Sequence, residues 1–431
     1  MVQLVDYVDK NLPPMRSGVE MIPVTHETKE LIYIHDPEGY LEKPFVLDKE
    51  IVALIPLLNG NYSVRDIRQE LQRYGSDVEE SQLLAFVRRL DKARLLLSPW
   101  FHHFKEKLES NFQELTVRPP VCAGQSYPSD PIALKDMLGK AFSSNGKTFC
   151  IGNTGRDVED RGVEDAGKVK ALFAPHIDPR VGLHSYIPAF QPLADLRPSR
   201  VVLLATSHYA GMFHPIYDGK PFIVTRKNFE TPLGVVPADQ RALDELQDHA
   251  SDCGCSFQDR AHRNEHSIEL HLIFLQYLWS HSFQLVPMLV GSLEELYYHK
   301  SGDIEKKVEA MAAFLRKKYG NDEGTIFLIS GDLAHIGRKF GDQRPASELF
   351  TEVKSFDRTF LNCAQKGDNA VLLELMKETY DPYRICGFPP LYTALTALPE
   401  LKGTVTSYSL WDEREQESAV TFGSLLYREI S

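Results

Sequence analysis

Residues 199–209 read SRVVLLATSHY, a continuous aliphatic run that ends in polar residues. Residues 169–178 (VKALFAPHID) and 324–335 (GTIFLISGDLAH) have the same form. Short runs rich in Val, Ile, Leu and Phe are typical of strands that are buried on both faces of a sheet. The histidines that follow the three runs are His176, His208 and His335. Because ligands of open α/β sheets bind beyond the carboxyl ends of the strands, we expect these imidazoles to meet at one sheet edge.

Similar strand patterns alternate with amphipathic segments from residue 122 onward. The further strand candidates are PFIVT (221–225), FQLVPMLVG (283–291), GTVTSYSL (403–410) and SAVTFGSLLY (418–427). The helical candidates are residues 267–281, 304–319, 347–365 and 369–378. This alternation predicts an α/β domain with a largely parallel central sheet and helices on both faces.

The first part of the chain is predicted to form a small, mainly helical domain. Asp48 is a candidate cap for a helix over residues 51–58, and Ser63 with Asp66 forms a candidate capping box for residues 64–74. A third helix is expected from its buried stripe, Leu83, Phe86, Val87 and Leu90. Apolar stretches, LIYIH and LLLSP, flank the three helices, which together indicate a winged helix-turn-helix.

A charged stretch over residues 100–120 is predicted to be a linker helix, which places the domains at residues 1–117 and 118–431. The third helix of the first domain mixes basic residues with acidic ones, as a solvated helix face does. Acidic residues outnumber basic ones by 60 to 48 over the whole chain, for a net charge of −12. This charge disfavours nucleic acid as a partner. A first domain that binds DNA as a regulator is therefore only a third alternative, after the two functions given at the end of this section.

The six cysteines are too few and too scattered for a disulfide framework in 431 residues. Charged residues interrupt the first 14 residues, and no segment approaches membrane-spanning length. We therefore expect free thiols, no membrane association and a cytoplasmic location. Cys122, Cys150 and Cys363 are interpreted as packing residues, and Cys253 and Cys255 as exposed loop thiols.

Several neutral imidazoles near carboxylates suit a transition metal better than magnesium or calcium. In the stretch NEHSIELHLIFLQYL, Glu265 and His266 are expected in the first turn of a buried helix, from which they can enter the crevice. Glu269 and His271 are expected to anchor that helix by hydrogen bonds. Cys386 lies in the stiff loop YRICGFPPLYTAL, which can orient a thiolate.

Eight short motifs follow one another along the second part of the chain: AGQSYP (123–128), APH (174–176), TSH (206–208), TPLGVVPAD (231–239), EHSIELHL (265–272), VPMLVG (286–291), SGDLAH (330–335) and ICG (385–387). In these motifs and their order the chain resembles the MEMO family, in particular protein B of the AmmeMemoRadiSam system. Residues 45–99 also look like the PqqD-type winged-helix domains that hold peptides for radical-SAM systems.

The resemblance implies a three-layer α/β/α sandwich like that of class III extradiol dioxygenases. It places the metal ligands at His176, His208 and Cys386, and iron(II), with copper or zinc as alternatives, suits this set. Asp332, His335, Glu265 and His266 are then the candidate catalytic residues, with His335, oriented by Asp332, as general acid or base.

The implied function is that of a metal-dependent redox enzyme that works with a radical-SAM protein and the other components of that system. The first domain would hold a peptide ligand. The alternative is a non-catalytic scaffold that binds a peptide or protein, or a metal carrier. Arg180, which lies close after His176 in the sequence, is expected to favour an anionic substrate.

Overall fold

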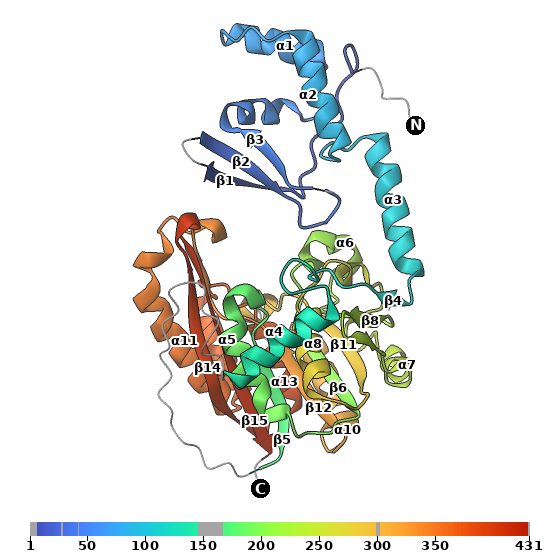
Figure 1. The fold of residues 1–431 in the computed structure, drawn as a ribbon, viewed down its shortest axis with the longest axis vertical. Coiled ribbons are helices and arrows are strands. Elements are labelled where there is room, and N and C mark those ends of the chain that lie inside the picture. The colour runs from blue at the N-terminus through green and yellow to red at the C-terminus, as the bar shows by residue number, and fades with distance from the viewer. Residues whose placement is uncertain (1–6, 27–28, 42, 145–166, 299–301, 430–431) are drawn as a thin grey trace. The chain divides into compact units, whose positions relative to one another are not determined.

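The computed structural model describes residues 7–26, 29–41, 43–144, 167–298 and 302–429 (Figure 1). The chain divides into two compact units, Met1–Glu114 and Leu115–Ser431. Among the described cysteines, all five are free, whereas Cys150 lies outside the described residues.

The first unit combines an antiparallel sheet with helices that follow it. The strands are β1 (Glu20–His26), β2 (Lys29–His35) and β3 (Phe45–Asp48), in the order β1-β2-β3. The helices are η1 (Lys49–Leu57), α1 (Val64–Arg73), α2 (Glu80–Lys92) and α3 (Pro99–Glu114). Apolar side chains of β2, β3, α1 and α2 share one core.

Two local predictions for this unit have different outcomes. Ser63 and Asp66 form the predicted capping box at the start of α1. Asp48 makes no capping hydrogen bond, and the segment after it is a 3₁₀ helix that contains Pro56, which cannot donate a backbone hydrogen bond. Helical residues outnumber strand residues in this unit, as expected, but the sequence had indicated only β2 of the three strands, as the apolar stretch LIYIH.

The second unit is built on a nine-stranded sheet in the order β10-β7-β11-β6-β12-β5-β15-β13, with β14 also paired to β15. The bounds are β5 (Val169–Ala174), β6 (Arg200–Thr206), β7 (Phe222–Val224), β10 (Cys255–Ser256), β11 (Gln284–Val290), β12 (Thr325–Ser330), β13 (His335–Gly337), β14 (Leu401–Glu413) and β15 (Ser418–Glu429). The four central strands β11, β6, β12 and β5 are parallel. Antiparallel pairs join β7 to β11, β15 to β5, and β14 and β13 to β15, whereas β10 pairs parallel with β7. The prediction of a largely parallel sheet therefore holds for the centre and for the β10 edge.

Helices cover both faces of this sheet (Figure 1). One apolar core contains side chains of α4 (Pro131–Ser143), α5 (Pro179–Phe190) and α8 (Glu269–Leu278). The other contains side chains of α7 (Gln240–Asp248), α10 (Asp303–Tyr319), α11 (Phe350–Gln365), α12 (Asn369–Thr379) and α13 (Phe388–Ala397). Successive β5 residues alternate between them, since Leu172 belongs to the first core and Phe173 to the second.

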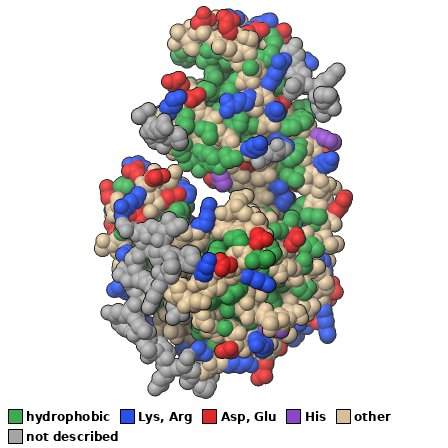
Figure 2. Space-filling view, in the orientation of Figure 1, with side chains coloured by type: hydrophobic (Ala, Val, Ile, Leu, Met, Phe, Trp, Pro, Cys, Tyr) green, Lys and Arg blue, Asp and Glu red, His purple; other side chains and the backbone are tan. Residues whose placement is uncertain are grey.

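Smaller elements complete the second unit. A three-stranded sheet contains β4 (Val117–Arg118), β8 (Asn228–Thr231) and β9 (Gly234–Val236). Short helices are α6 (His214–Tyr217) and α9 (Glu295–Tyr298), and six further 3₁₀ turns connect other elements of the described chain. None of the described helices is both long and apolar enough to cross a membrane. Figure 2 shows basic and acidic side chains interspersed over the visible face of this unit.

Candidate metal centre

His176 follows β5 after one intervening residue, and its ring is held by Ser330 at the end of β12. The Nδ1 atom lies 3.0 Å from Ser330 Oγ, and the Ser330 hydroxyl itself donates to the Ser267 carbonyl at 2.7 Å. Since the hydroxyl proton is engaged there, Nδ1 of His176 must be the donor in the first bond. The lone pair of His176 Nε2 is therefore free to bind a metal.

His208 follows β6 in the same way and is held by a buried carboxylate. Its Nδ1 atom lies 2.8 Å from Glu265 Oε1, and its backbone N–H donates to Glu265 Oε2 at 2.8 Å. Glu265 Oε1 also accepts the backbone N–H groups of His266 and Ser267. Both carboxylate oxygens are thus committed to holding His208 and the segment before α8, and His208 Nε2 is left for a metal.

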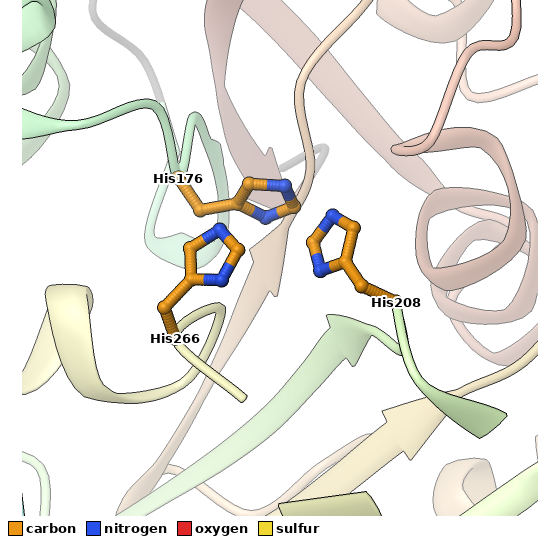
Figure 3. Close-up of side chains that lie close together, drawn as sticks. All are labelled: His176, His208 and His266. Carbon is orange, nitrogen blue, oxygen red and sulfur yellow. The ribbon is translucent and has the colours of Figure 1, made fainter. Parts of the chain in front are cut away.

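His266 lies in the irregular segment before α8, which begins at Glu269 and not at Glu265 as expected. Its ring stacks on that of His208, with centroids 4.7 Å apart and planes 17° apart. The His176 ring stands edge-on to both (Figure 3). One ligand atom from each of the three imidazoles lies within 4.8 Å of the others, a spacing at which the three could hold one metal ion.

Cys386 lies next to this cluster in the loop before α13. Its Sγ atom is 3.4 Å from His176 Nε2 and accepts the backbone N–H of Asp332 at 3.2 Å. Gly331 and Gly387 permit this approach, because a Cβ atom at position 331 would lie 2.1 Å from the Cα atom of Gly387. The thiol thus lies beside His176, although it is not part of the group of mutually close ligand atoms that the three imidazoles form.

Burial and mutual repulsion set the charge of these groups. Burial lowers the pKa of His176 well below its ordinary value, and it lowers that of His266 to about 4, in both cases with help from His208. Burial also disfavours the charged form of His208, but Glu265 and Cys386 outweigh it and raise the His208 pKa well above its ordinary value. Burial raises the pKa of the Cys386 thiol, against the influence of His208. The cluster thus holds neutral imidazoles around one imidazole paired with an ionised carboxylate.

Asp332 and His335 lie on the chain after β12, but they are not paired with each other as the sequence analysis had expected. Asp332 Oδ1 accepts the backbone N–H groups of His176 and Ile177, and burial raises the pKa of this carboxyl to about 7. His335 Nδ1 lies 3.1 Å from the carbonyls of both Leu333 and Arg384, so it carries the proton and Nε2 is the basic atom. Burial lowers the pKa of His335 to about 4.

The segment that carries Glu265 is anchored by an ion pair that the sequence analysis did not anticipate. Arg118 and Glu269 are both fully buried, with Nη1 and Oε2 2.6 Å apart. Glu269 also accepts hydrogen bonds from Val121, Cys122 and Tyr127, and Arg118 donates to the carbonyl of Glu265. The prediction that Glu269 anchors this helix is confirmed.

Two other predictions near the site were wrong. Both ring nitrogens of His271 lack a hydrogen-bond partner among the described residues, and the ring instead packs beside those of Tyr186 and Phe190. Arg180 is exposed and forms a bidentate pair with Asp178, so its charge is already compensated. A free cation for an anionic substrate is therefore not found at Arg180.

The fold and the site define an α/β protein whose sheet edge gathers nitrogen and sulfur donors suited to a transition metal. Residues 118–426 match the family described as Memo-like protein. The chain belongs to this family.

Relatives of known sequence differ in how much of the chain they match. A MEMO1 family protein of Aquifex aeolicus is 27% identical over 91% of this chain and 95% of its own length. One of Thermus thermophilus is 26% identical over 84% of this chain and 98% of its own length. One of Methanosarcina barkeri is 26% identical over 67% of this chain and 89% of its own length. Since the second unit makes up about three-quarters of the chain, the first two matches must extend into the first unit.

Proposed function

We propose that this protein is a metal-dependent oxidoreductase in which His176, His208 and His266 hold a transition metal and the Cys386 thiolate is a fourth donor. The observation that carries this proposal is the approach of three imidazoles, of which His176 is buried, His266 is half-buried and His208 is exposed, to within 4.8 Å. The fit is chemical as well as spatial, because hydrogen bonds to Ser330 and Glu265 leave Nε2 of His176 and His208 free.

Nitrogen donors with one thiolate suit iron(II), copper(I) or zinc, and we propose iron(II) as the native metal. When bound, such a metal supplies Lewis-acid polarisation of a substrate oxygen and, for iron, one-electron chemistry. A buried thiol becomes a metal ligand only as the thiolate, so metal binding would release its proton.

The residues of the chain would then divide the remaining tasks. Glu265 would position His208, and Ser330 would position His176. His335 would act as the general base through Nε2, because it is neutral at pH 7 and its other nitrogen is held by two carbonyls. Asp332 would accept or donate a second proton, because burial raises its pKa to about 7 and both protonation states are then populated at neutral pH.

Elemental analysis of anaerobically purified protein tests the metal centre. We expect about one equivalent of iron per chain, and its loss in the variants His208→Ala, His266→Ala and Cys386→Ala. His214→Ala and Cys363→Ala are matched controls, since His214 is exposed and Cys363 lies outside the cluster. Full metal content in the His208→Ala variant would refute the site.

The assignment to a radical-SAM system of the AmmeMemoRadiSam type is also a proposal, supported by the motif order of the sequence. The first unit supports the related proposal that a peptide is held by a PqqD-like, winged-helix domain. Its strand β3 is an edge strand, and a cavity of about 220 Å³ beside it is lined by Lys43, Arg89, Lys92 and Arg94 among other residues. An edge strand next to cationic side chains favours an extended acidic peptide over a nucleic acid.

Co-purification from the native host tests these partners. A radical-SAM protein is expected with the full chain, and the charge-reversal variant Arg89→Glu should weaken capture of an acidic peptide without changing the metal content. Partner capture without any turnover of substrate by the iron-loaded protein would favour the alternative, a non-catalytic scaffold or metal carrier.

A further inference from the structure

A cavity of about 370 Å³ lies in the second unit and shares a wall with the candidate metal centre. Cys386 and Thr206 belong to that wall, and the Thr206 hydroxyl donates to the Cys386 carbonyl at 2.7 Å. The cavity is therefore bordered by Cys386, the residue whose Sγ atom lies 3.4 Å from His176 Nε2. A substrate of the proposed metal centre that enters through this cavity would contact its lining before it reaches the metal.

Three tyrosines form the outer part of the lining. Tyr298 and Tyr380 stack with ring centroids 5.4 Å apart, although they are 64% and 59% exposed. Tyr297, which is buried, lies against Tyr298 at a centroid distance of 6.4 Å. Aromatic faces carry negative partial charge and attract cations, most strongly when water is excluded.

The charged groups of the lining are also mainly acidic. Glu294 and Asp381 both line the cavity, and neither takes part in an ion pair among the described residues. Both carboxylate oxygens of Asp381 accept the backbone N–H of Ile385. Glu294, Asp381 and Tyr297 line the same cavity, and burial together with these two carboxylates raises the pKa of the Tyr297 phenol.

Arg384 is the cation among the described lining residues, and its charge is already matched. Its Nε donates to the His335 carbonyl, and its Nη2 lies 2.6 Å from Asp342 Oδ2. With Arg384 paired, the carboxylates of Glu294 and Asp381 give the lining of the cavity a net negative charge. Because like charges repel, an anionic substrate group is disfavoured here.

We propose that this cavity binds the ammonium group of an amine or quaternary-ammonium substrate, with the tyrosines as its aromatic wall and Glu294 and Asp381 as its counter-charges. This inference rests on the proposed function, because it assigns a substrate class to the metal centre. The ammonium group would lie among the tyrosines while the rest of the substrate extends toward Cys386.

Binding of choline, compared with its neutral isostere 3,3-dimethyl-1-butanol, tests the charge preference without any need for turnover. Titration calorimetry of the purified full chain should give a Kd for choline about tenfold lower than for the isostere, as expected for two or three cation–π contacts. The Glu294→Gln and Tyr298→Ala variants should each weaken choline binding about three- to tenfold, and Glu294→Gln should leave binding of the isostere unaffected. Glu374→Gln is the matched control, because this exposed residue of α12 is not among the lining residues.

Equal affinity for choline and the isostere would overturn the proposal, as would absence of choline binding at millimolar concentrations or tighter binding of the anion 3,3-dimethylbutyrate. Metal content is measured on the same samples. If the His208→Ala variant loses its metal but still binds choline, the cavity binds the ammonium group independently of the metal, and the two proposals can fail separately. If the unaltered protein has a normal metal content but does not bind choline, the proposed substrate class is overturned and the metal centre is not.

Discussion

Replacement of Glu265 by glutamine probes how the buried carboxylate controls the metal centre. Glu265 is 1% exposed and accepts four N–H groups, of which two belong to His208. Glutamine has the same shape but only one acceptor oxygen. If that oxygen keeps the position of Oε1, the amide NH₂ faces the backbone N–H of His208, and two donors are left opposite each other in a buried site.

These contacts set the expected losses of stability and of metal affinity in the Glu265→Gln variant. One buried N–H without an acceptor costs about 1–3 kcal/mol of folding free energy. Loss of a carboxylate behind a metal-binding histidine typically weakens metal affinity about 10- to 100-fold, which is about 1.4–2.8 kcal/mol. The unpaired N–H lowers the stability of the fold, and the lost carboxylate weakens metal binding. Only the weaker metal binding should change the metal Kd of the folded protein.

Competition with a fluorescent zinc chelator measures this Kd, since zinc avoids oxidation during the titration. Asp357→Asn is the matched control because Asp357 is a fully buried carboxylate on α11 that accepts the Tyr408 hydroxyl, away from the cluster. We expect the control to keep the Kd of the unaltered protein. NMR titration of the metal-free protein adds a second readout, because the His208 pKa, which Glu265 raises, should fall in the Glu265→Gln variant.

A zinc Kd of Glu265→Gln within twofold of the unaltered protein would refute the positioning role. An equal loss of affinity in Asp357→Asn would refute it as well, because the effect would then reflect general destabilisation. An unchanged His208 pKa would show that the carboxylate does not hold the imidazole in solution.

Three further predictions concern the surroundings of the site. Gly331→Ala should lower metal affinity in the chelator assay, because its Cβ would lie 2.1 Å from the Cα of Gly387 and displace the loop of Cys386; unchanged affinity would contradict this. Arg118→Ala should lower the free energy of unfolding in urea by about 3–5 kcal/mol, because it leaves Glu269 buried without its partner; a loss under 1 kcal/mol would contradict that. Burial raises the pKa of Asp357 to about 7, so the folded chain keeps a proton that the unfolded chain releases near pH 4. The free energy of unfolding should therefore decrease between pH 4 and 7 by up to about 1.4 kcal/mol per unit from this group, a slope that urea titrations should find reduced in Asp357→Asn.

The histidines at the strand ends were predictable from sequence because the same pattern, a buried apolar run followed by a histidine, occurs more than once. His176 and His208 each follow a buried run after one intervening residue, and parallel neighbours bring equivalent positions to one edge. The direction of the outer strands was not predictable, because a strand buried on both faces has the same composition whether its neighbour is parallel or antiparallel.

The position of His266 depends on contacts that are distant in sequence. The segment that carries it is fixed by Arg118 through the Glu265 carbonyl and the Glu269 carboxylate, nearly 150 residues away. Sequence placed His266 near the crevice but gave no sign that its ring would stack on His208. The short motif EHS directly before a buried helix was the signal available.

The side chains that we propose as metal ligands are held in place by other groups of the protein. His176 is held from β12 by Ser330, His208 from the segment before α8 by Glu265, and Cys386 from the chain after β12 by Asp332. Each of these contacts joins two segments of the second unit, and both hydrophobic cores support the strands on which they depend. A small metal-folded domain lacks such support and is unfolded without its ion. Here the two hydrophobic cores stabilise the fold, so the binding free energy of a metal would add to a stability that is already present. The positions of the proposed ligands are then set by the fold.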